Sequence, residues 1–521
     1  MNFNSNIMKK DMPSFSRRRF ISSCAACSTC MAISPLLIGS SCSSSNSETM
    51  RIRVIYSLQQ ELVQVRPDWP NVGFNFKPVI DNYNAMLSKN FPSFEFISTL
   101  AIGEEDAKNI LKKDEEVNVD GYIVHQLNCQ SHILPTIAKS GKPVIYVDFK
   151  YGGTGRFLGY VSRILNEEQA NVGFVSSSRN EDLLSAVKCF EIIAKGGTVN
   201  EFVQAVTNKR VQLTPEPGDL ACKSDVFNSL SGEECLRRMK ELRILAVRDQ
   251  NARSAEPIMG IPLEHITFSE VNQAWENADK DEANEIAERW VKSSTEVIDV
   301  PFDEIQNSAA MYLGMRSVLK NHNANAITIN CLGGFYGGHI HAYPCLGFHE
   351  LNNQGLVGAC ECDIRSTATM VAFTTMTQGR PGYISDPVID TSKRQIIYAH
   401  CVAPNKMFGP AGPTNPYSIM THSEDRQGAC VRSILPLDYM TTSLKIDNRR
   451  KAIVFHQAKA VDNDPDDRAC RTKLCAEPIG DIEKLFTKWD WGWHRVTFYG
   501  NLEKQIYELA DVLGWKVIRE V

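Results

Sequence analysis

The chain has 521 residues, of which 43% are hydrophobic and 22% are charged, with a formal net charge of -5. A single hydrophobic core rarely grows beyond about 250 residues, so we expect two or three domains. The small negative charge offers no basic surface to nucleic acid, and no apolar stretch approaches the roughly 20 residues that cross a bilayer. We therefore expect neither a nucleic-acid partner nor a membrane-spanning segment in the body of the protein.

Residues 1–47 are predicted to be an export signal and a Ser-rich tether, separate from the fold. Consecutive arginines at 17–19 follow a polar start and precede a short, weakly apolar segment at 31–39. This order is typical of a twin-arginine signal, which exports folded proteins. We therefore predict a periplasmic protein. The alternative to an export signal at these residues is a disordered basic tail.

Cys42 raises the further alternative of a lipid anchor. It follows small residues and precedes a Ser-rich stretch, as the acylated cysteine of a lipoprotein does. Gly39, however, matches poorly the larger apolar residue that such a processing site prefers. A lipid anchor at Cys42 is therefore the minor alternative to a free periplasmic protein.

Residues 51–175 are predicted to form an N-terminal α/β domain, because buried strands separated by helices are typical of a parallel sheet covered on both faces. The predicted strands are 51–56, 121–124 and 142–148, and the predicted helix is 133–140. The run YGGTGR at 151–156 follows the last strand, where open α/β sheets bind ligands. It lacks a nucleotide-binding fingerprint, which leaves a sugar-contacting loop or a tight turn.

Residues 176–350 are predicted to form a second α/β domain, so that two Rossmann-like or flavodoxin-like units follow one another. A linker at 212–219 carries Pro215 and Pro217. The predicted helices are 182–195 and 281–292, and the predicted strands are 243–247 and 326–330.

Residues 351–521 are predicted to form a mostly antiparallel β domain that carries the chemistry. Strand patterns alternate here with long Gly- and Pro-containing loops, which are uncommon in a compact domain without a functional cause. The predicted strands are 395–399, 452–455 and 495–499, with a helix-like run at 367–373 and a final helix at 503–513.

Acids and histidines are gathered at predicted strand ends of this last domain. Glu361 and Asp363 flank a cysteine, Asp386 is placed at the end of a strand, as is His400, and His494 precedes another. Carboxylates favour Mn²⁺ or Mg²⁺, and imidazoles admit Mn²⁺, Co²⁺ or Zn²⁺. A core histidine or a salt-bridged acid is the plainer explanation of each residue alone. Together they form a candidate site for a divalent cation.

Three tryptophans alternate just before His494. Trp489, Trp491 and Trp493 are three of the seven tryptophans of the chain. Flat aromatic faces of this kind suit the packing of sugar rings, although simple core packing is the competing explanation.

The same region resembles the C-terminal half of the fucose/arabinose isomerase superfamily. The similarity is clearest over residues 331–500, whereas upstream only the layout of two successive α/β domains is similar. The runs that carry it are NCLGGFYGGHIHAYPCLGF, GLVGACECDIRSTATM, GRPGYISDPVID, IIYAHCVAP and WGWHRVTFYG.

The resemblance implies a set of roles for residues of this chain. By motif, the metal ligands fall on Glu361, Asp386, His400 and His494, with Mn²⁺ as the expected ion and Mg²⁺, Co²⁺ or Zn²⁺ as alternatives. Glu361 and Asp386 would also act as base and acid. Substrate contacts are assigned to Trp491, Trp493, Tyr336 and His341. The predicted export signal and the loops before Glu361, with their histidines, depart from the family and leave the sugar open.

The activity implied is an interconversion of aldose and ketose through a cis-enediol. A cation bridging two adjacent substrate oxygens stabilises the negative charge that grows on them, and two carboxylates move the proton. Other metal-assisted sugar reactions, such as epimerisation, aldol cleavage or dehydration, are the first alternative, and a non-catalytic carbohydrate-binding protein is the second. By resemblance, we also expect a homo-oligomer, either a trimer or a hexamer.

Overall fold

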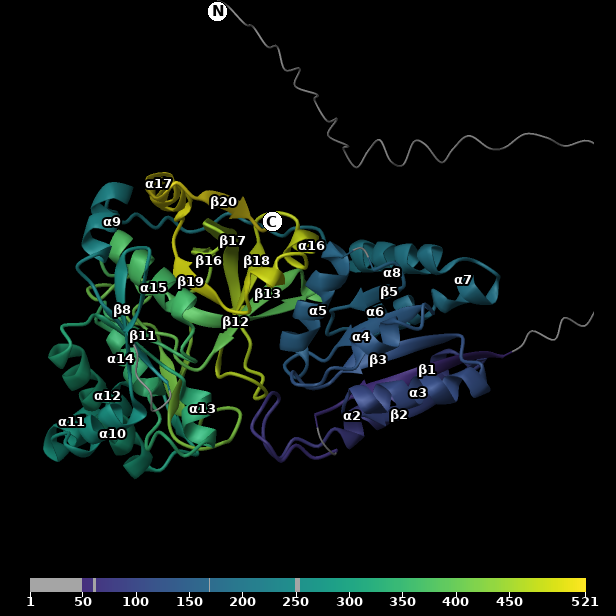
Figure 1. Cartoon of the computed structure of the whole chain (residues 1–521), viewed down its shortest axis with the longest axis horizontal. Helices are drawn as coiled ribbons and strands as arrows, with labels where there is room; N and C mark the ends of the chain where they lie inside the picture. The colour runs from purple at the N-terminus through teal and green to yellow at the C-terminus, as the bar shows by residue number, and fades with distance from the viewer. Residues whose placement is uncertain (1–48, 60–61, 168, 249–253) are drawn as a thin grey trace, which may run out of the picture. The chain divides into compact units, whose positions relative to one another are not determined.

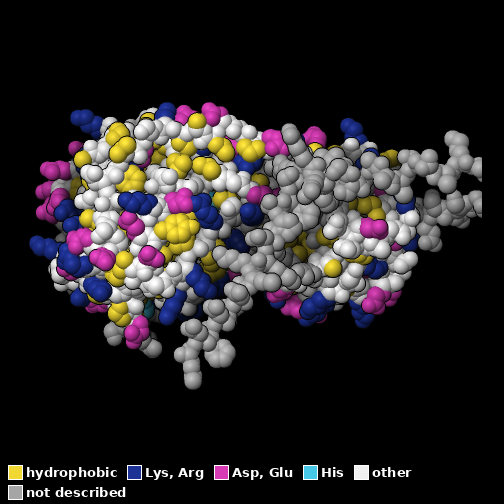
Figure 2. Space-filling view, turned by 90° about the horizontal axis from the view of Figure 1, so that it is seen from above, with side chains coloured by type: hydrophobic (Ala, Val, Ile, Leu, Met, Phe, Trp, Pro, Cys, Tyr) yellow, Lys and Arg dark blue, Asp and Glu magenta, His cyan; other side chains and the backbone are white. Residues whose placement is uncertain are grey.

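The computed structural model describes residues 49–59, 62–167, 169–248 and 254–521. The predicted twin-arginine signal, the Ser-rich tether and Cys42 lie outside the described residues. Within the described ranges, no helix has both the length and the apolar character needed to cross a membrane. On the face drawn in Figure 2, basic and acidic side chains of the described residues are interspersed, and neither sign forms a broad patch.

The first region is a parallel sheet with helices on both faces, as predicted (Figure 1). Its strands are β1 (Met50–Ser57), β2 (Phe94–Ala101), β3 (Gly121–Gln126), β4 (Val144–Asp148) and β5 (Val172–Val175). Its helices are α2 (Lys77–Asn90), α3 (Glu104–Val117), α4 (Leu134–Ala138), α5 (Thr154–Asn166), α6 (Asn180–Val187), α7 (Phe190–Ala194) and α8 (Val199–Leu213). Every residue of β3, β4 and β5 is buried, as expected for strands covered on both sides.

The strand order of this sheet, β2-β1-β3-β4-β5, places a topological switch between β1 and β3. Ligands of open α/β sheets bind at the carboxyl ends of the strands at such a point. One core packs α2, α6, α7 and α8 against one face of the sheet. The other packs α3, α4 and α5 against the opposite face and continues into the C-terminal β domain.

The second region is a mixed sheet of order β11-β10-β6-β8-β7, parallel except for the edge strand β7. Its strands are β6 (Ile244–Val247), β7 (Ser254–Ile258), β8 (Ile261–Ile266), β10 (Ala326–Ile329) and β11 (Val357–Ala359). Its helices are α9 (Gly232–Met239), α10 (Phe268–Glu276), α11 (Lys280–Ser293), α12 (Phe302–Asn321), α13 (Cys331–Tyr336), α14 (Cys345–Asn353) and α15 (Ile364–Met376).

The third region is an antiparallel β-barrel. Strand order β16-β19-β12-β13-β18-β17 is closed by pairing of β17 with β16, and β20 adds in parallel to β17. Its strands are β12 (Tyr383–Asp390), β13 (Gln395–His400), β16 (Met440–Asp447), β17 (Ala452–Asn463), β18 (Thr472–Pro478), β19 (Arg495–Tyr499) and β20 (Lys516–Arg519). Its helical elements are η2 (Thr391–Lys393), α16 (Ile482–Leu485), η3 (Trp489–Trp491) and α17 (Glu503–Leu513).

A small sheet connects the second region to the loops of the barrel. Its strands are β9 (Val297–Ile298), β14 (Tyr417–Met420) and β15 (Cys430–Ser433). One continuous core extends from the second sheet into the barrel. The fold class inferred from the sequence, two parallel-sheet regions followed by an antiparallel β domain, is confirmed.

Two local expectations need correction. The predicted helix at 182–195 is divided into α6 and α7, with Lys188 and Cys189 between them. Asp386 does not end a strand: it is the fourth residue of the eight-residue β12 and pairs with Ala399 of β13. The barrel strand continues past the carboxylate because Pro387 to Asp390 remain paired with β13.

Candidate active site

Glu361 is positioned by a tight turn between β11 and α15. Glu361 and the following Cys362 have φ angles of 60° and 51°, a left-handed conformation that is uncommon outside glycine. Asp363 then begins the helix, because its carboxylate accepts a hydrogen bond from the backbone N–H of Ser366 at 3.1 Å. The side chain of Glu361 keeps 29% of its surface exposed, which leaves the carboxylate accessible to a ligand.

The barrel supplies the other three residues of the cluster. Asp386 lies on β12, His400 ends the neighbouring β13, and His494 directly precedes β19, which pairs with β12. The ligand atoms of Glu361, Asp386, His400 and His494 all lie within 4.8 Å of one another. Residues separated by up to 133 positions therefore meet at one point, as the sequence pattern predicted.

Distances within this cluster are short and centre on one imidazole. His494 Nε2 lies 3.3 Å from Glu361 Oε2 and 3.2 Å from Asp386 Oδ1. His400 Nε2 lies 3.8 Å from Glu361 Oε1. Acidic oxygens and imidazole nitrogens thus face one small volume, which is the arrangement that a divalent cation requires.

Asp363 orients the His494 ring from behind. Its Oδ2 lies 3.1 Å from His494 Nδ1 and also accepts a hydrogen bond from Lys445 Nζ at 2.8 Å. A carboxylate on one ring nitrogen holds the proton there and leaves the other nitrogen free to bind metal. This role of Asp363 could not be predicted from the sequence, because Lys445 and His494 are distant from it in the chain.

Burial and charge shift the pKa values of these groups. Burial alone would raise the pKa of Glu361, but the neighbouring His494 and His400 lower it below the usual value. Burial is likewise outweighed at Asp363, where the hydrogen bond from His494 and the charge of Lys445 lower the pKa well below the usual range. Burial opposes a charge on His494, but Glu361, Asp363 and Asp386 raise its pKa well above the usual value.

The donor set fits a metal ion, with one difference between the histidines. His400 Nε2 and His494 Nε2 are both buried and make no hydrogen bond to the described residues. His400 Nδ1, however, accepts the backbone N–H of Cys401 at 3.0 Å, which places the proton of a neutral ring on Nε2. Glu361, Asp386 and His494 are therefore the better ligands, and His400 is the weakest of the four.

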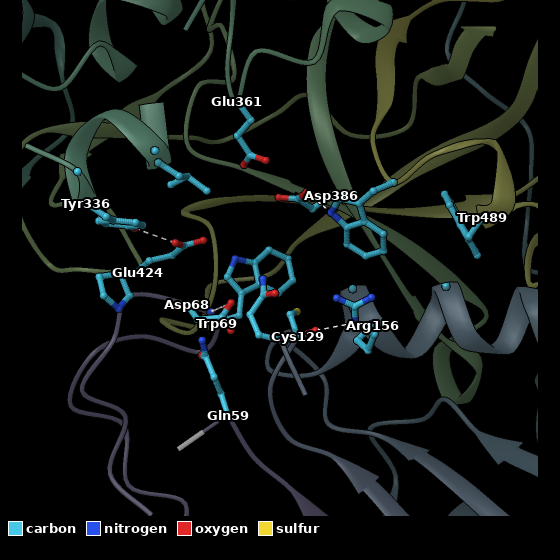
Figure 3. Close-up of a pocket in the computed structure, with 18 residues that line it drawn as sticks. Gln59, Asp68, Trp69, Cys129, Arg156, Tyr336, Glu361, Asp386, Glu424 and Trp489 are labelled. Carbon is cyan, nitrogen blue, oxygen red and sulfur yellow. Dashed lines mark hydrogen bonds between the residues drawn. The ribbon is translucent and has the colours of Figure 1, made fainter. Parts of the chain in front are cut away.

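A cavity of about 740 Å³ opens beside the cluster (Figure 3). This volume lies within the usual range of small-molecule sites. All three regions contribute to its walls, including the loops after β1 and β3 at the switch point of the first sheet. Its lining residues include Gln59, Asp68, Trp69, Cys129, Gln130, Arg156, Tyr336, Glu361, Asp386, Glu424, Trp489 and Trp493.

The predicted substrate contacts divide into two groups. Trp493 and Tyr336 line the cavity, and Trp493 Nε1 donates a hydrogen bond to Asp386 Oδ1 at 2.6 Å. Trp491 does not line it and instead lies under the Arg450 guanidinium, 4.3 Å from its ring centre. His341 is half exposed, 3.9 Å from Glu276, and lines a different hollow.

Several cavity residues were missed by the sequence analysis. Asp68, Cys129 and Arg156 come from the first region, and Glu424 comes from the connection between β14 and β15. Arg156 ends the YGGTGR run that had been singled out as a ligand-contacting loop or a turn, so a signal existed for it. Asp68 and Glu424 stand in polar loops that resemble any solvated segment.

The sequence has distant relatives among sugar isomerases. It is 26% identical over 123 residues to a sulfoquinovose isomerase of Alkalicoccus urumqiensis, a match that covers 22% of this chain and 28% of that protein. It is 21% identical over 199 residues to sulfoquinovose isomerases of Priestia aryabhattai and Priestia megaterium, covering 36% of this chain and 44% of each of those proteins. The matches therefore span less than half the length of these curated relatives.

Other comparisons add little. No protein-family model matches the sequence. A solved chain described as "XylFII molecule" is 11% identical and covers 56% of this chain and 85% of its own length, with a TM-score of 0.15, a value too low to compare the two folds. The cluster of Glu361, Asp386, His400 and His494 could hold a metal ion.

Proposed function

We propose that this protein is a divalent-metal-dependent aldose–ketose isomerase. The observation that carries the proposal is the convergence of Glu361, Asp386, His400 and His494 within 4.8 Å, at the wall of a cavity of sugar size. Binding a sugar does not require an acid and a base, whereas moving a proton does, and Glu361 and Asp386 of the cluster can supply them. The similarity to sulfoquinovose isomerases supports the same reaction class.

The reaction requires a proton to leave C2 of the open aldose and a proton to return to C1. A divalent ion held by Glu361, Asp386 and His494, with Mn²⁺ as our choice, would stabilise the charge growing on the two substrate oxygens. Glu361 and Asp386 would bracket the C1–C2 edge, one carboxylate taking the C2 proton and the other supplying a proton at C1. The hydrogen bond from Trp493 fixes the direction of the Asp386 carboxylate.

The decisive experiment incubates the purified protein with Mn²⁺ and a panel of aldoses and measures ketose formation. We expect Glu361→Gln to lower turnover by at least about 100-fold, because acid–base groups contribute roughly 10²- to 10⁴-fold. Glu276→Gln, which changes an exposed carboxylate outside the cavity, is the matched control and should retain activity. A fully active Glu361→Gln protein, or activity that survives a chelator, would contradict the proposal.

The panel should contain sulfoquinovose, fucose, arabinose and glucose. Sulfoquinovose carries a sulfonate group, and Arg156 is the one Lys or Arg among the described lining residues of the cavity. We therefore propose a sugar with an anionic group as the first substrate to test. Neutral aldoses in the same panel show whether the charge matters.

The two histidines provide a second test of the metal site. Because the Cys401 N–H holds the ring proton of His400 on Nε2, we expect His494→Gln to weaken Mn²⁺ binding more than His400→Gln does. Calorimetric titration of the metal-free proteins with Mn²⁺ measures both. Equal losses would show that His400 is as good a ligand as His494.

A further inference from the structure

Two acidic residues of the cavity stand apart from the metal-type cluster. Asp68 lies between β1 and α2, and Glu424 lies between β14 and β15. Figure 3 shows both residues among those that line the cavity, with Tyr336 beside Glu424. Neither belongs to the four-residue cluster, and nothing in the isomerisation step requires them.

One carboxylate oxygen of Asp68 has no hydrogen-bond donor among the described residues. Its Oδ1 accepts the backbone N–H of Trp69 at 2.8 Å. Its Oδ2 is buried and has no hydrogen-bond partner among the described residues, and only 8% of the residue is exposed. An unsatisfied buried polar atom costs about 1–3 kcal/mol, and more when charged. A ligand hydroxyl in the cavity would remove that cost.

Glu424 is held in place by a hydrogen bond from Tyr336 and by a backbone hydrogen bond from Val72. Its Oε2 accepts a hydrogen bond from Tyr336 Oη at 2.8 Å, which leaves Oε1 for a ligand. Its carbonyl oxygen accepts the backbone N–H of Val72 at 2.7 Å and so ties its loop to the segment that carries Asp68. The segments that carry the two carboxyl groups are therefore joined, although 356 positions separate Asp68 from Glu424 in the chain.

The surroundings of the two residues bring both pKa values close to neutral pH. Burial raises the pKa of Asp68 to about 7, although the hydrogen bond from the Trp69 backbone N–H and the charge of Arg156 oppose the rise. Burial raises the pKa of Glu424 to about 8, with Asp68 and Glu361 adding to the rise and His422 and Tyr336 opposing it. Between these two pKa values Asp68 is mostly ionised and Glu424 mostly protonated, so Asp68 can serve as base and Glu424 as acid.

We propose that Asp68 and Glu424 open the ring of a cyclic aldose before it is isomerised. The inference rests on the proposed function for its class of substrate. Isomerisation through a cis-enediol needs a free carbonyl group at C1. In a pyranose this carbon is a hemiacetal instead. In the proposed function Glu361 and Asp386 hold the ion and act at the C1–C2 edge, which leaves Asp68 and Glu424 available for this earlier step.

The step balances without any further reactant. Asp68 accepts the proton of the C1 hydroxyl. The electron pair of the broken O–H bond then forms the second bond of C1=O. The bond between C1 and the ring oxygen breaks, and the leaving ring oxygen takes a proton from Glu424. The pair ends with Asp68 protonated and Glu424 ionised, and reversal of the step on the other face of C1 exchanges the α and β anomers.

Exchange of anomers can be measured separately from isomerisation. A single anomer of sulfoquinovose, L-fucose, L-arabinose or D-glucose is dissolved with the metal-loaded protein, and exchange is followed by polarimetry and by NMR magnetisation transfer. We expect exchange above the uncatalysed rate in proportion to protein concentration for at least one sugar, with a maximum between about pH 7 and pH 8. Absence of acceleration for all four sugars overturns the proposal.

Substitutions assign the effect to the pair. We expect Asp68→Asn and Glu424→Gln each to lower the anomer-exchange rate at saturating sugar by about 100-fold, with melting temperatures showing that the proteins are folded. Glu424→Asp, which keeps a carboxyl group, should restore part of the rate. Glu105→Gln, on the exposed side of α3, is the matched control and should leave the rate unchanged.

The outcomes separate this inference from the proposed function. Variants that lose affinity for sugar but keep the saturated exchange rate would show that the pair only binds hydroxyls, which overturns the ring-opening role. Ketose formation without accelerated anomer exchange also overturns it and leaves the isomerase proposal standing. Accelerated exchange that needs the pair, with no ketose from any aldose, supports the ring-opening role and overturns the isomerase proposal.

Discussion

The cavity has two walls that differ in how their charged groups are satisfied. On the C-terminal wall, Asp363 accepts a hydrogen bond from Lys445 and lies 3.1 Å from His494 Nδ1, although the Nε2 atoms of His400 and His494, which face the cluster, make no hydrogen bond to the described residues. On the N-terminal wall, Asp68 has an unpartnered oxygen, and Arg156 makes a hydrogen bond only to the carbonyl of Cys129 and forms no ion pair among the described residues. Groups satisfied by the protein hold one geometry, whereas groups left open are those that a ligand must satisfy.

The largest expected effect comes from breaking the buried network that supports the C-terminal wall. Glu520 accepts hydrogen bonds from Arg495, the residue that follows His494. It also lies 2.7 Å from His456 Nδ1, and the side chains of all three residues of this contact are fully buried. Removing one partner of a buried ion pair costs about 3–5 kcal/mol, so Glu520→Gln should lose that much free energy of unfolding in urea. Glu503→Gln, which breaks the exposed pair with Arg519, should cost less than about 1 kcal/mol.

The same carboxylate predicts a pH dependence of stability. Burial would raise the pKa of Glu520, but the charge of Arg495 and the contact with His456 lower it to about 2. A depressed folded-state pKa means that the ionised group stabilises the fold above its unfolded pKa of about 4.3. We expect this contribution to be lost as the pH falls from about 5 toward 2. Urea unfolding of Glu520→Gln should show a weaker acid dependence, and an unchanged dependence would remove Glu520 as the cause.

Next in size is the effect of loosening His494. Asp363→Asn replaces the charged acceptor that orients the ring and should weaken Mn²⁺ binding by about 10- to 100-fold, as is usual for residues that position a ligand. Calorimetric titration measures this, with Asp490→Asn, in an exposed pair with Arg450, as the control. Unchanged affinity would mean that barrel packing alone fixes His494.

A smaller effect is expected on the open wall. Arg156→Gln should raise the KM for sulfoquinovose about tenfold, because a hydrogen bond to a charged group contributes roughly 1.5–3 kcal/mol. The KM for a neutral aldose and the Mn²⁺ affinity should not change. Arg163→Gln, on the exposed face of the same helix, is the control. An equal rise in KM for neutral and anionic sugars would show that Arg156 does not distinguish between them by charge.

The smallest effect separates two of the tryptophans. Trp493→Phe removes the N–H that donates to Asp386 and should lower kcat several-fold, by about the 1 kcal/mol of a typical hydrogen bond. Trp491→Phe should change kcat and KM by less than about twofold, because its ring contacts Arg450 outside the cavity. Equal effects of the two substitutions would contradict this placement.

Most of the strands and helices could be predicted from the sequence, because the residue patterns that indicate them lie within short segments. Runs such as 142–148 are apolar and β-branched, and they became buried parallel strands. The division of 182–195 into two helices was not predictable, because no glycine or proline marks the break at Lys188 and Cys189. Closure of the barrel depends on the pairing of β16 with β17 and on contacts between strands distant in the chain, which periodicity does not reveal.

The candidate site was predicted where motifs carried it and missed where only tertiary structure did. Glu361 and His494 stood in recognisable runs and come together. The place of Asp68 and Glu424 in the cavity depends on the meeting of the loop after β1 with the loop between β14 and β15. His341 was misplaced with respect to the cavity because its loop turns toward α10, and nothing in its neighbours indicates that direction.

The left-handed turn at Glu361 and Cys362 sets a limit on engineering. A non-glycine residue in this conformation costs roughly 1–2 kcal/mol, and here two occur in succession. Cys362→Gly would relieve part of that cost and raise heat tolerance, but it would also free the backbone that aims the Glu361 carboxylate. Efforts to stabilise the protein should therefore leave this turn unchanged and substitute residues elsewhere.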